Sequence, residues 1–297
     1  MAKSVFTGIC RTRTRGVGEM PSLNKHSENE QVERDGGADR ELPPFDTTVA
    51  SQARVWNYWL GGKDHFASDR EASEKVLAAM PSLLQIARAS RRFLADAVTL
   101  LARDYGIRQF LDIGTGLPTA DNTHEVAQRV APDSRIVYVD YDPSVLRHAQ
   151  ALLSSTPEGR TDFILADLRD TKTILTAADR TLDFTKPVAI FLITTLHFLP
   201  DADRPHEIVT ELLDAVPSGS FLVILHAPSD IRPQEVAEGK RRYSAAGSFN
   251  PRPRAEVARF FDGLEMIGPG LVNLTEWWDS EEPDTGLAGY VGIGRKP

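Results

Sequence analysis

The stretch QFLDIGTGLPTADNT, residues 109–123, decides the fold. Its apolar run, residues 110–113, predicts a short buried strand, and Gly114 and Gly116 follow at once. Glycine lets the backbone turn sharply there and lets a ligand approach without a Cβ in the way. The polar residues that follow are typical of a helix N-terminus, which we expect near Asp121. The stretch therefore predicts the strand, tight turn and helix of an α/β nucleotide-binding unit.

The spacing of the glycines narrows the choice of ligand. A dinucleotide fingerprint requires a third glycine at position 119, where this chain has Thr119. The remaining pattern, Asp-x-Gly-x-Gly from Asp112, is typical of enzymes that bind S-adenosylmethionine (SAM), which has no pyrophosphate to cradle. A simple strand-to-helix turn is the alternative interpretation, because the pattern is short.

Strands and helices alternate from residue 107 onward, which predicts an α/β domain over residues 107–297. We expect seven strands in a mostly parallel sheet with helices on both faces. The expected strands are 109–113, 135–139, 162–166, 187–193, 219–225, 264–267 and 288–294. Helices are expected near 121 and at 143–153, 204–215 and 254–261.

The residues before this domain fall into two segments. Residues 1–48 are polar and of mixed charge, which predicts a disordered tail that is solvated or touches an acidic partner through its arginines. Residues 49–106 predict a helical lid segment, with helices at 68–79 and 81–103. Three arginines of the second helix, Arg88, Arg91 and Arg92, are expected on a solvated face, from which one could reach an anionic group.

An aromatic cluster begins the lid segment. Trp56, Tyr58 and Trp59 stand directly before Gly61 and Gly62. One interpretation is a short amphipathic helix that ends in a glycine cap. The other is a lid whose aromatic faces stack on a ligand and whose glycines let the chain turn over it. The residues alone leave both interpretations open.

Composition restricts the function classes. The formal net charge of −8 and the pI near 5.4 argue against a general nucleic-acid binder. Cys10 is the single cysteine, so no internal disulfide can form, which fits a reducing compartment. The sequence also has neither an apolar run of about 18 residues nor the apolar core of a secretory signal. We expect a cytoplasmic protein with a small-molecule partner and without nucleic-acid or membrane partners; a homodimer is left open.

Polar side chains follow several predicted strands at the point where each strand ends. Ligands of open α/β sheets bind at this edge. Asp140 is placed to accept hydrogen bonds from ribose hydroxyls, and Asp167 from an adenine amino group. Either could instead cap a helix, but together with Asp112 they favour a nucleoside-bearing ligand. The predicted cofactor-binding residues are Tyr58, Gly62, Asp112, Gly114, Gly116, Asp140, Tyr141, Asp167, Leu168, Thr194 and Thr195.

Two histidines are candidates for proton transfer. His197 follows the fourth strand and His226 ends the fifth. His197 stands between Leu196 and Phe198, so a structural role is the alternative, and we expect it to tune the chemistry rather than to perform it. No cluster of ligands has metal-binding spacing, and no nucleophile elbow or Walker loop is present, which favours a metal-free transferase.

Several long motifs occur in a characteristic order: RVWNYWLGGKDHF, FLDIGTGLPT with NTHEVAQ, VYVDYDPSVLRHA, ADLRD, LHFLPD, RFFDGLEMIGPGLV and GYVGIGRK. From about residue 48 to the C-terminus, the chain resembles a bacterial family of SAM-dependent methyltransferases long known as a domain of unknown function. The resemblance implies a Rossmann-like class I methyltransferase fold, with Gly114, Gly116, Asp140 and Asp167 as SAM contacts.

The chain departs from the family pattern at the lid and at one later position. Asn57–Leu60 reads NYWL where family members usually carry Asp-Tyr-Leu-Leu, and Ser90 replaces a usual Asn. We expect the lid changes to alter the substrate pocket. Because Asn57 stands where the family usually has Asp, the sequence does not support a base inherited at position 57.

The sequence therefore predicts a SAM-dependent methyltransferase that acts on a small-molecule O, N or C nucleophile. Transfer of another SAM substituent and a catalytically silent SAM-binding protein are the alternatives.

Overall fold

The computed structural model describes residues 44–152, 154–243, 248–278 and 288–297. The predicted tail, residues 1–48, lies almost wholly outside these ranges. Its last residues are described, and there the ring of Phe45 packs against Phe66 with 6.2 Å between ring centroids. The chain from Leu42 to Pro297 forms one compact unit.

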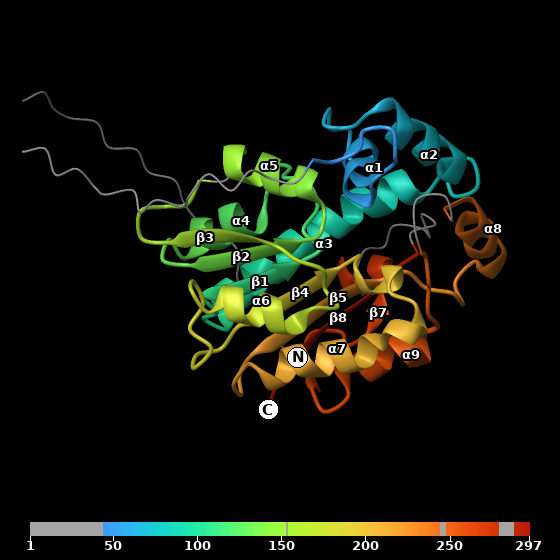
Figure 1. The fold of residues 1–297 in the computed structure, drawn as a ribbon. Coiled ribbons are helices and arrows are strands. Elements are labelled where there is room, and N and C mark those ends of the chain that lie inside the picture. Colours follow the sequence, from blue (N-terminus) through green and yellow to red (C-terminus); the bar gives the residue numbers. More distant parts are fainter. Residues whose placement is uncertain (1–43, 153, 244–247, 279–287) are drawn as a thin grey trace, which may run out of the picture. The chain divides into compact units, whose positions relative to one another are not determined.

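The centre of this unit is a mostly parallel sheet (Figure 1). Among the described residues it has eight strands in the order β3-β2-β1-β4-β5-β8-β6, and β7 also pairs with β8. Strands β1 to β5 pair in parallel, whereas β6 and β7 pair with β8 in antiparallel fashion, as does β5. The strands are β1 (Gln109–Ile113), β2 (Arg135–Asp140), β3 (Arg160–Leu165), β4 (Ala189–Ile193), β5 (Phe221–His226), β6 (Glu265–Met266), β7 (Val272–Asn273) and β8 (Tyr290–Arg295).

The prediction of an α/β fold with a mostly parallel sheet is confirmed, and all seven expected strands are present within a few residues. The predicted number of strands is one too low. The additional strand, β7, has only two residues, which is too short for an alternating pattern to reveal.

The described helices include each helix that the sequence predicts. They are α1 (Gln52–Trp59), α2 (Ala67–Leu77), α3 (Leu83–Asp104), α4 (Thr123–Val130), α5 (Pro143–Leu152), α6 (Thr171–Ala178), α7 (Pro205–Asp214), α8 (Pro233–Tyr243) and α9 (Arg254–Ala258). The sequence analysis did not predict α6 and α8. Helix α6 has only eight residues, and α8 reads PQEVAEGKRRY, which has few apolar residues to mark a buried face.

Two apolar clusters cover the two faces of the sheet. On one face α6, α7 and α9 pack against alternate strand residues such as Leu111 and Ile190. On the other face α3 and α4 pack against the intervening residues, such as Phe110 and Phe191. Successive strand residues point to opposite faces, so β1 and β4 are buried along their whole length. The carboxyl ends of these strands are therefore held rigidly by the core.

The N-terminal helices form a smaller apolar cluster of their own, with Val55, Trp59, Val76 and Ala87 at its centre. A buried ion pair joins α1 to α2, because Arg54 Nε donates to Asp69 Oδ2 at 2.9 Å and both side chains are almost fully buried. Helix α8 lies beside α2 (Figure 1).

Candidate functional site

A cavity of about 490 Å³ lies at the carboxyl ends of β1, β2 and β4. Along the chain, β1 to β3 build the sheet in one direction and β4 to β5 in the other, so the strand order reverses between β1 and β4. Open α/β sheets bind ligands at such a switch point. The predicted cofactor-binding residues that line the cavity are Asp112, Gly114, Gly116, Asp140, Tyr141, Asp167, Leu168, Thr194 and Thr195.

The turn after β1 requires glycine at Gly114. Its φ of +76° favours glycine, and a Cβ at this position would lie 2.4 Å from Thr195 Oγ1. Gly116 also has positive φ, +66°, but a Cβ there would meet nothing within 4 Å. The backbone at Gly116 is thus open to the cavity, as the sequence pattern requires for close approach of a ligand.

Asp140 is held in place by two backbone N–H groups. Its Oδ2 accepts from the Gly116 N–H at 2.8 Å, and its Oδ1 accepts from the Asp142 N–H at 3.0 Å. The side chain is 6 % exposed, and burial raises its pKa to about 6 despite these two hydrogen bonds. Each oxygen keeps a further lone pair, so the carboxylate can accept two more hydrogen bonds from a ligand.

Asp112 lies deeper, at the end of β1. Its Oδ2 accepts from the Thr123 hydroxyl at 2.6 Å, which ties the strand to the first residue of α4. Helix α4 itself is capped at Asn122, whose N–H donates to Glu125. Burial raises the pKa of Asp112, and the Thr123 hydrogen bond and the charge of Arg91 partly oppose that rise.

Asp167 already accepts hydrogen bonds from a nearby arginine. Arg169 binds both of its oxygens, at 2.8 Å and 2.5 Å, and also reaches Asp203 at 3.3 Å. The hydrogen bonds from Arg169 lower the pKa of Asp167. Asp167 therefore stays ionised beside the cavity. Its Oδ1 also accepts from the Arg169 backbone N–H, so one lone pair on Oδ2 remains for a donor such as an amino group.

Arg91 is a cavity residue that the sequence analysis placed on a solvated face, which is wrong for this arginine. Arg88 and Arg92 are exposed, but Arg91 lines the cavity and donates to the carbonyl oxygens of Ala120 and Asp121. Its Nε is buried and has no hydrogen-bond partner among the residues that the structure describes. The wall of the cavity thus carries a cationic side chain, which would attract a bound anionic group.

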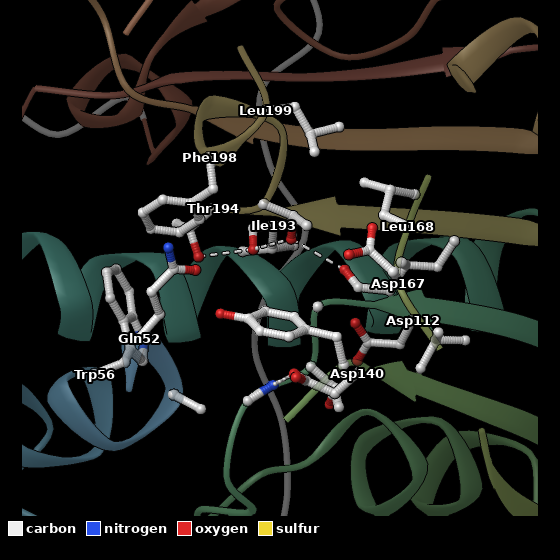
Figure 2. A pocket seen from close by; sticks show the side chains of 18 of the residues that line it. Gln52, Trp56, Asp112, Asp140, Asp167, Leu168, Ile193, Thr194, Phe198 and Leu199 are labelled. Carbon is white, nitrogen blue, oxygen red and sulfur yellow. Dashed lines mark hydrogen bonds between the residues drawn. The ribbon is translucent and has the colours of Figure 1, made fainter. Parts of the chain in front are cut away.

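Helix α1 covers the cavity with one of its faces. Gln52, Ala53 and Trp56 line it, as residues one turn apart should when they share a face. Figure 2 shows Trp56 and Phe198 at one end of the cavity and Asp112, Asp140 and Asp167 at the other. The Ser51 hydroxyl, at the N-cap of α1, donates to Asp142, which joins the helix to the loop that holds Asp140.

Tyr58 and Gly62, both predicted to bind the cofactor, do not line this cavity. Two residues after Trp56, the helix has turned through more than half a circle, and the Tyr58 ring packs on His65 at 4.9 Å. Gly62 packs on Asn57, whose amide would lie 2.4 Å from a Cβ at this position. Asn57 is itself 3 % exposed and accepts from the Asp64 N–H, so it does not present a base to the cavity. Ser90, the other departure from the family pattern, does line the cavity.

His197 and His226 are both buried outside this cavity. His226 donates from Nδ1 to the Ala227 carbonyl, and its Nε2 accepts from Arg252, so both of its ring nitrogens are used. Burial lowers the pKa of His226 to about 3 and that of His197 well below its ordinary value. A histidine that stays neutral at physiological pH in this way is a weak general base, which supports the structural interpretation of His226.

Arg252 holds the loop after β4 that carries His197. It is 2 % exposed and donates to the carbonyl oxygens of Leu196 and Leu199, and to Asp201 at 2.7 Å. This role could not be read from the sequence, because Arg252 lies about fifty residues after the loop that it braces.

Among the described helices, none is both long and apolar enough to cross a bilayer. Nor do the described residues contain a group of three or more His, Cys, Asp or Glu side chains placed to hold a metal ion.

Comparisons with known proteins agree with this geometry. Residues 38–297 match the family model described as S-adenosyl methyltransferase. A solved DUF574 family protein from Streptomyces avermitilis is 44% identical, with a TM-score of 0.82 over 85% of this chain and 99% of that one. A candidate methyltransferase from Thermobifida fusca is 38% identical, with a TM-score of 0.78 over 84% of this chain and 96% of that one. No curated protein matched.

Proposed function

The chain belongs to the S-adenosyl methyltransferase family and is a SAM-dependent enzyme, and we propose that it methylates an O, N or C nucleophile of a small molecule. The observation that carries this proposal is the division of the cavity into a carboxylate-lined end and an end closed by Trp56 and Phe198. The first end suits the cofactor. The end closed by Trp56 and Phe198 limits which molecules can approach the cofactor.

The residues at the carboxylate end fit SAM. The volume of about 490 Å³ lies within the range of about 300 to 1,000 Å³ typical of ligand sites. Asp140 would accept from the two ribose hydroxyls, and Asp167 from the adenine amino group. The half-exposed ring of Tyr141 would lie against the adenine.

The amino-acid end of SAM carries an ammonium and a carboxylate, and the cavity offers a partner for each. Arg91 would attract the carboxylate through its positive charge, and Asp112 would attract the ammonium. A charge-assisted hydrogen bond between such groups contributes about 1.5 to 3 kcal/mol. Burial lowers the pKa of Arg91 in the free protein and the charge of Asp112 opposes that fall, so the cavity carries complementary groups before a ligand enters.

The chain would contribute to methyl transfer mainly by positioning. When bound, SAM supplies an electrophilic methyl group on a sulfonium that needs no further activation. Trp56 would offer its ring to the positive sulfonium. Helix α1 would exclude water from the reacting groups, and the rigid ends of β1 and β4 would fix the distance between them.

A small-molecule acceptor is favoured because α1 covers the cavity and because the loop after β4 narrows it. Gln52 and Trp56 approach from α1, and Phe198 and Leu199 approach from the loop. A protein or nucleic-acid acceptor would need an open path to the methyl group. The net charge of −8 further disfavours nucleic acid.

The proposal is tested with SAM that carries a ¹³C-labelled methyl group and a bacterial extract divided by ultrafiltration at about one kilodalton. We expect S-adenosylhomocysteine (SAH) to form and the label to appear in a small molecule, which becomes heavier by one methylene. The Asp140→Ala variant serves as the control that should not turn over at the same SAM concentration.

Label in the large-molecule fraction alone would contradict the small-molecule proposal. Tight SAM binding without any SAH formation in either fraction would favour a catalytically silent binder. SAH formed without methyl transfer would favour another reaction of SAM.

A further inference from the structure

A second, smaller cavity of about 60 Å³ adjoins the first. The two cavities share three wall residues, Trp56, Thr194 and Phe198. The remaining walls of the second cavity are almost wholly apolar. They come from the N-terminal helices and α8, with Ile86 and Val236 among them, and from the end of β5 and nearby loops. Trp56 and Phe198 thus separate the cofactor cavity from an apolar space behind them.

His197 is the titratable residue on the wall of this space. It is 5 % exposed, and its Nδ1 accepts from the Ala227 N–H at 3.3 Å. The ring proton therefore lies on Nε2, because a neutral imidazole carries only one. Nε2 makes no hydrogen bond to any described residue, and it is not among the fully sealed polar atoms. His197 thus brings a buried donor, without a partner among the described residues, to the wall of the apolar cavity.

Thr194 marks the junction of the two cavities with a strained backbone. Its φ of +57° is rare for a β-branched residue. Hydrogen bonds hold it in place, because its N–H donates to Leu225 and its hydroxyl to Ile193. Strain that the surrounding structure maintains is typical of ligand and active sites.

We propose that this second cavity, which we call the acceptor cavity, binds a compact apolar part of the methyl acceptor. Its volume equals that of about four to six water-sized spheres, which allows a group of about that many nonhydrogen atoms. His197 Nε2–H donates to one hydrogen-bond acceptor on that group, such as a carbonyl oxygen. The reacting atom projects between Trp56 and Phe198 into the cofactor cavity. The inference rests on the proposed function, and His197 acts as a substrate-binding donor rather than as a base.

The first experiment compares two probes of nearly the same shape by NMR titration, in the presence and absence of SAH. Cyclopentanone has a carbonyl oxygen, and methylenecyclopentane has a CH₂ group in its place. We expect cyclopentanone to bind about 5- to 10-fold more tightly, the gain from one hydrogen bond. Equal affinities, or no binding of either probe, would overturn the proposal.

Two substitutions of His197 separate its donor from its structural role. His197→Asn keeps an acceptor near the position of Nδ1 for the Ala227 N–H but lacks an atom at Nε2. His197→Gln places an amide near Nε2 instead. We expect the preference for cyclopentanone to disappear in the Asn variant and to persist in the Gln variant. A preference that survives in the Asn variant would refute the role of His197.

Filling the acceptor cavity provides the matching test. Ile86→Phe and, separately, Val236→Leu add volume on walls that the cofactor cavity does not share. Both variants should lose at least fivefold in affinity for the two probes and bind SAH as the native chain does. Undiminished probe binding would place the probes elsewhere and overturn the proposal. Failure of the native chain to bind SAH would instead contradict the proposed function. This outcome is distinguishable, because the probes are also titrated in the absence of SAH.

Discussion

Asp140 should make cofactor affinity depend on pH. Burial raises its pKa to about 6 in the free protein, so lowering the pH from 7 to 5 protonates it. The protonated carboxyl can no longer accept from two ribose hydroxyls while it also accepts from the Gly116 and Asp142 N–H groups. Ligand binding therefore requires loss of the proton, and affinity falls as the pH falls.

The size of the effect follows from the pKa. If ribose binding brings the pKa of Asp140 well below 5, the dissociation constant of SAH should rise about tenfold from pH 7 to pH 5. Between pH 7 and pH 6 the dissociation constant should rise less than twofold, because at least half of the Asp140 carboxyl groups are still ionised at these pH values.

The raised pKa of Asp140 also makes the free energy of unfolding depend on pH. The folded free protein binds more protons than the unfolded chain between about pH 4 and pH 6, since the carboxyl pKa is higher in the folded state. The contribution of Asp140 to the free energy of unfolding is therefore greatest below pH 4. It falls by about 3 kcal/mol as the pH rises through 6. SAH should offset this loss, so its stabilising effect should grow with pH over the same range.

Calorimetric titration of SAH at pH 5, 6 and 7, at constant ionic strength, measures the effect. Asp140→Asn should bind SAH more weakly at pH 7 and lose most of the fall in affinity between pH 7 and pH 5. Asp112→Asn is the matched control, because Asp112 is also a buried carboxylate of the cavity with a raised pKa. The Asp112→Asn variant should retain the fall in SAH affinity that protonation of Asp140 causes at low pH. A constant affinity of the native chain from pH 7 to pH 5, or the same fall in Asp140→Asn, would refute the reasoning.

Four further substitutions test other parts of the site. Arg91→Met should weaken SAH about 10- to 100-fold but leave 5′-methylthioadenosine, which lacks the carboxylate, unaffected in calorimetry; equal losses would contradict the assignment. Trp56→Leu should weaken SAM about 2- to 30-fold more than SAH, which has no sulfonium, and an unchanged affinity ratio would exclude this contact. Tyr58→Ala should lower the melting temperature without changing SAH affinity, because its ring packs outside the cavity; calorimetry and thermal unfolding distinguish the two effects. Asp69→Ala should destabilise the protein by about 3 to 5 kcal/mol in urea unfolding, because Arg54 would stay buried without its carboxylate, and a loss below 1 kcal/mol would show that water replaces it.

Local signals were enough to predict the sheet and its ligand edge. The pattern of β1, Gly114 and the capped helix lies within fifteen residues, so it needs no knowledge of distant contacts. The strand ends that carry Asp112, Asp140 and Asp167 are far apart in sequence. Parallel pairing brings them to one edge, so predicting the strands also predicted their proximity.

Local sequence signals could not predict which face each N-terminal helix turns toward the cavity. The aromatic cluster indicated that α1 takes part in the site, but only packing decides that Trp56 faces the cavity and Tyr58 faces His65. The same holds for α3, where Arg91 turns inward although both Arg88 and Arg92 are exposed. Helical periodicity defines a face, but the partner that covers the face comes from elsewhere in the chain.

The two cavities are built from different parts of the fold, and this bears on how substrate choice can change. The carboxylate end of the cofactor cavity is fixed by strand ends of a sheet whose strands β1 and β4 are buried along their whole length, where a substitution would disturb the core. The acceptor cavity instead has part of its wall on α1, α2, α3 and α8, which are outside the sheet. Its walls can therefore exchange one apolar side chain for another at little cost to the cofactor site. Members of one family can thus share SAM and differ in acceptor, with residues such as Val236 setting the size of the group that enters.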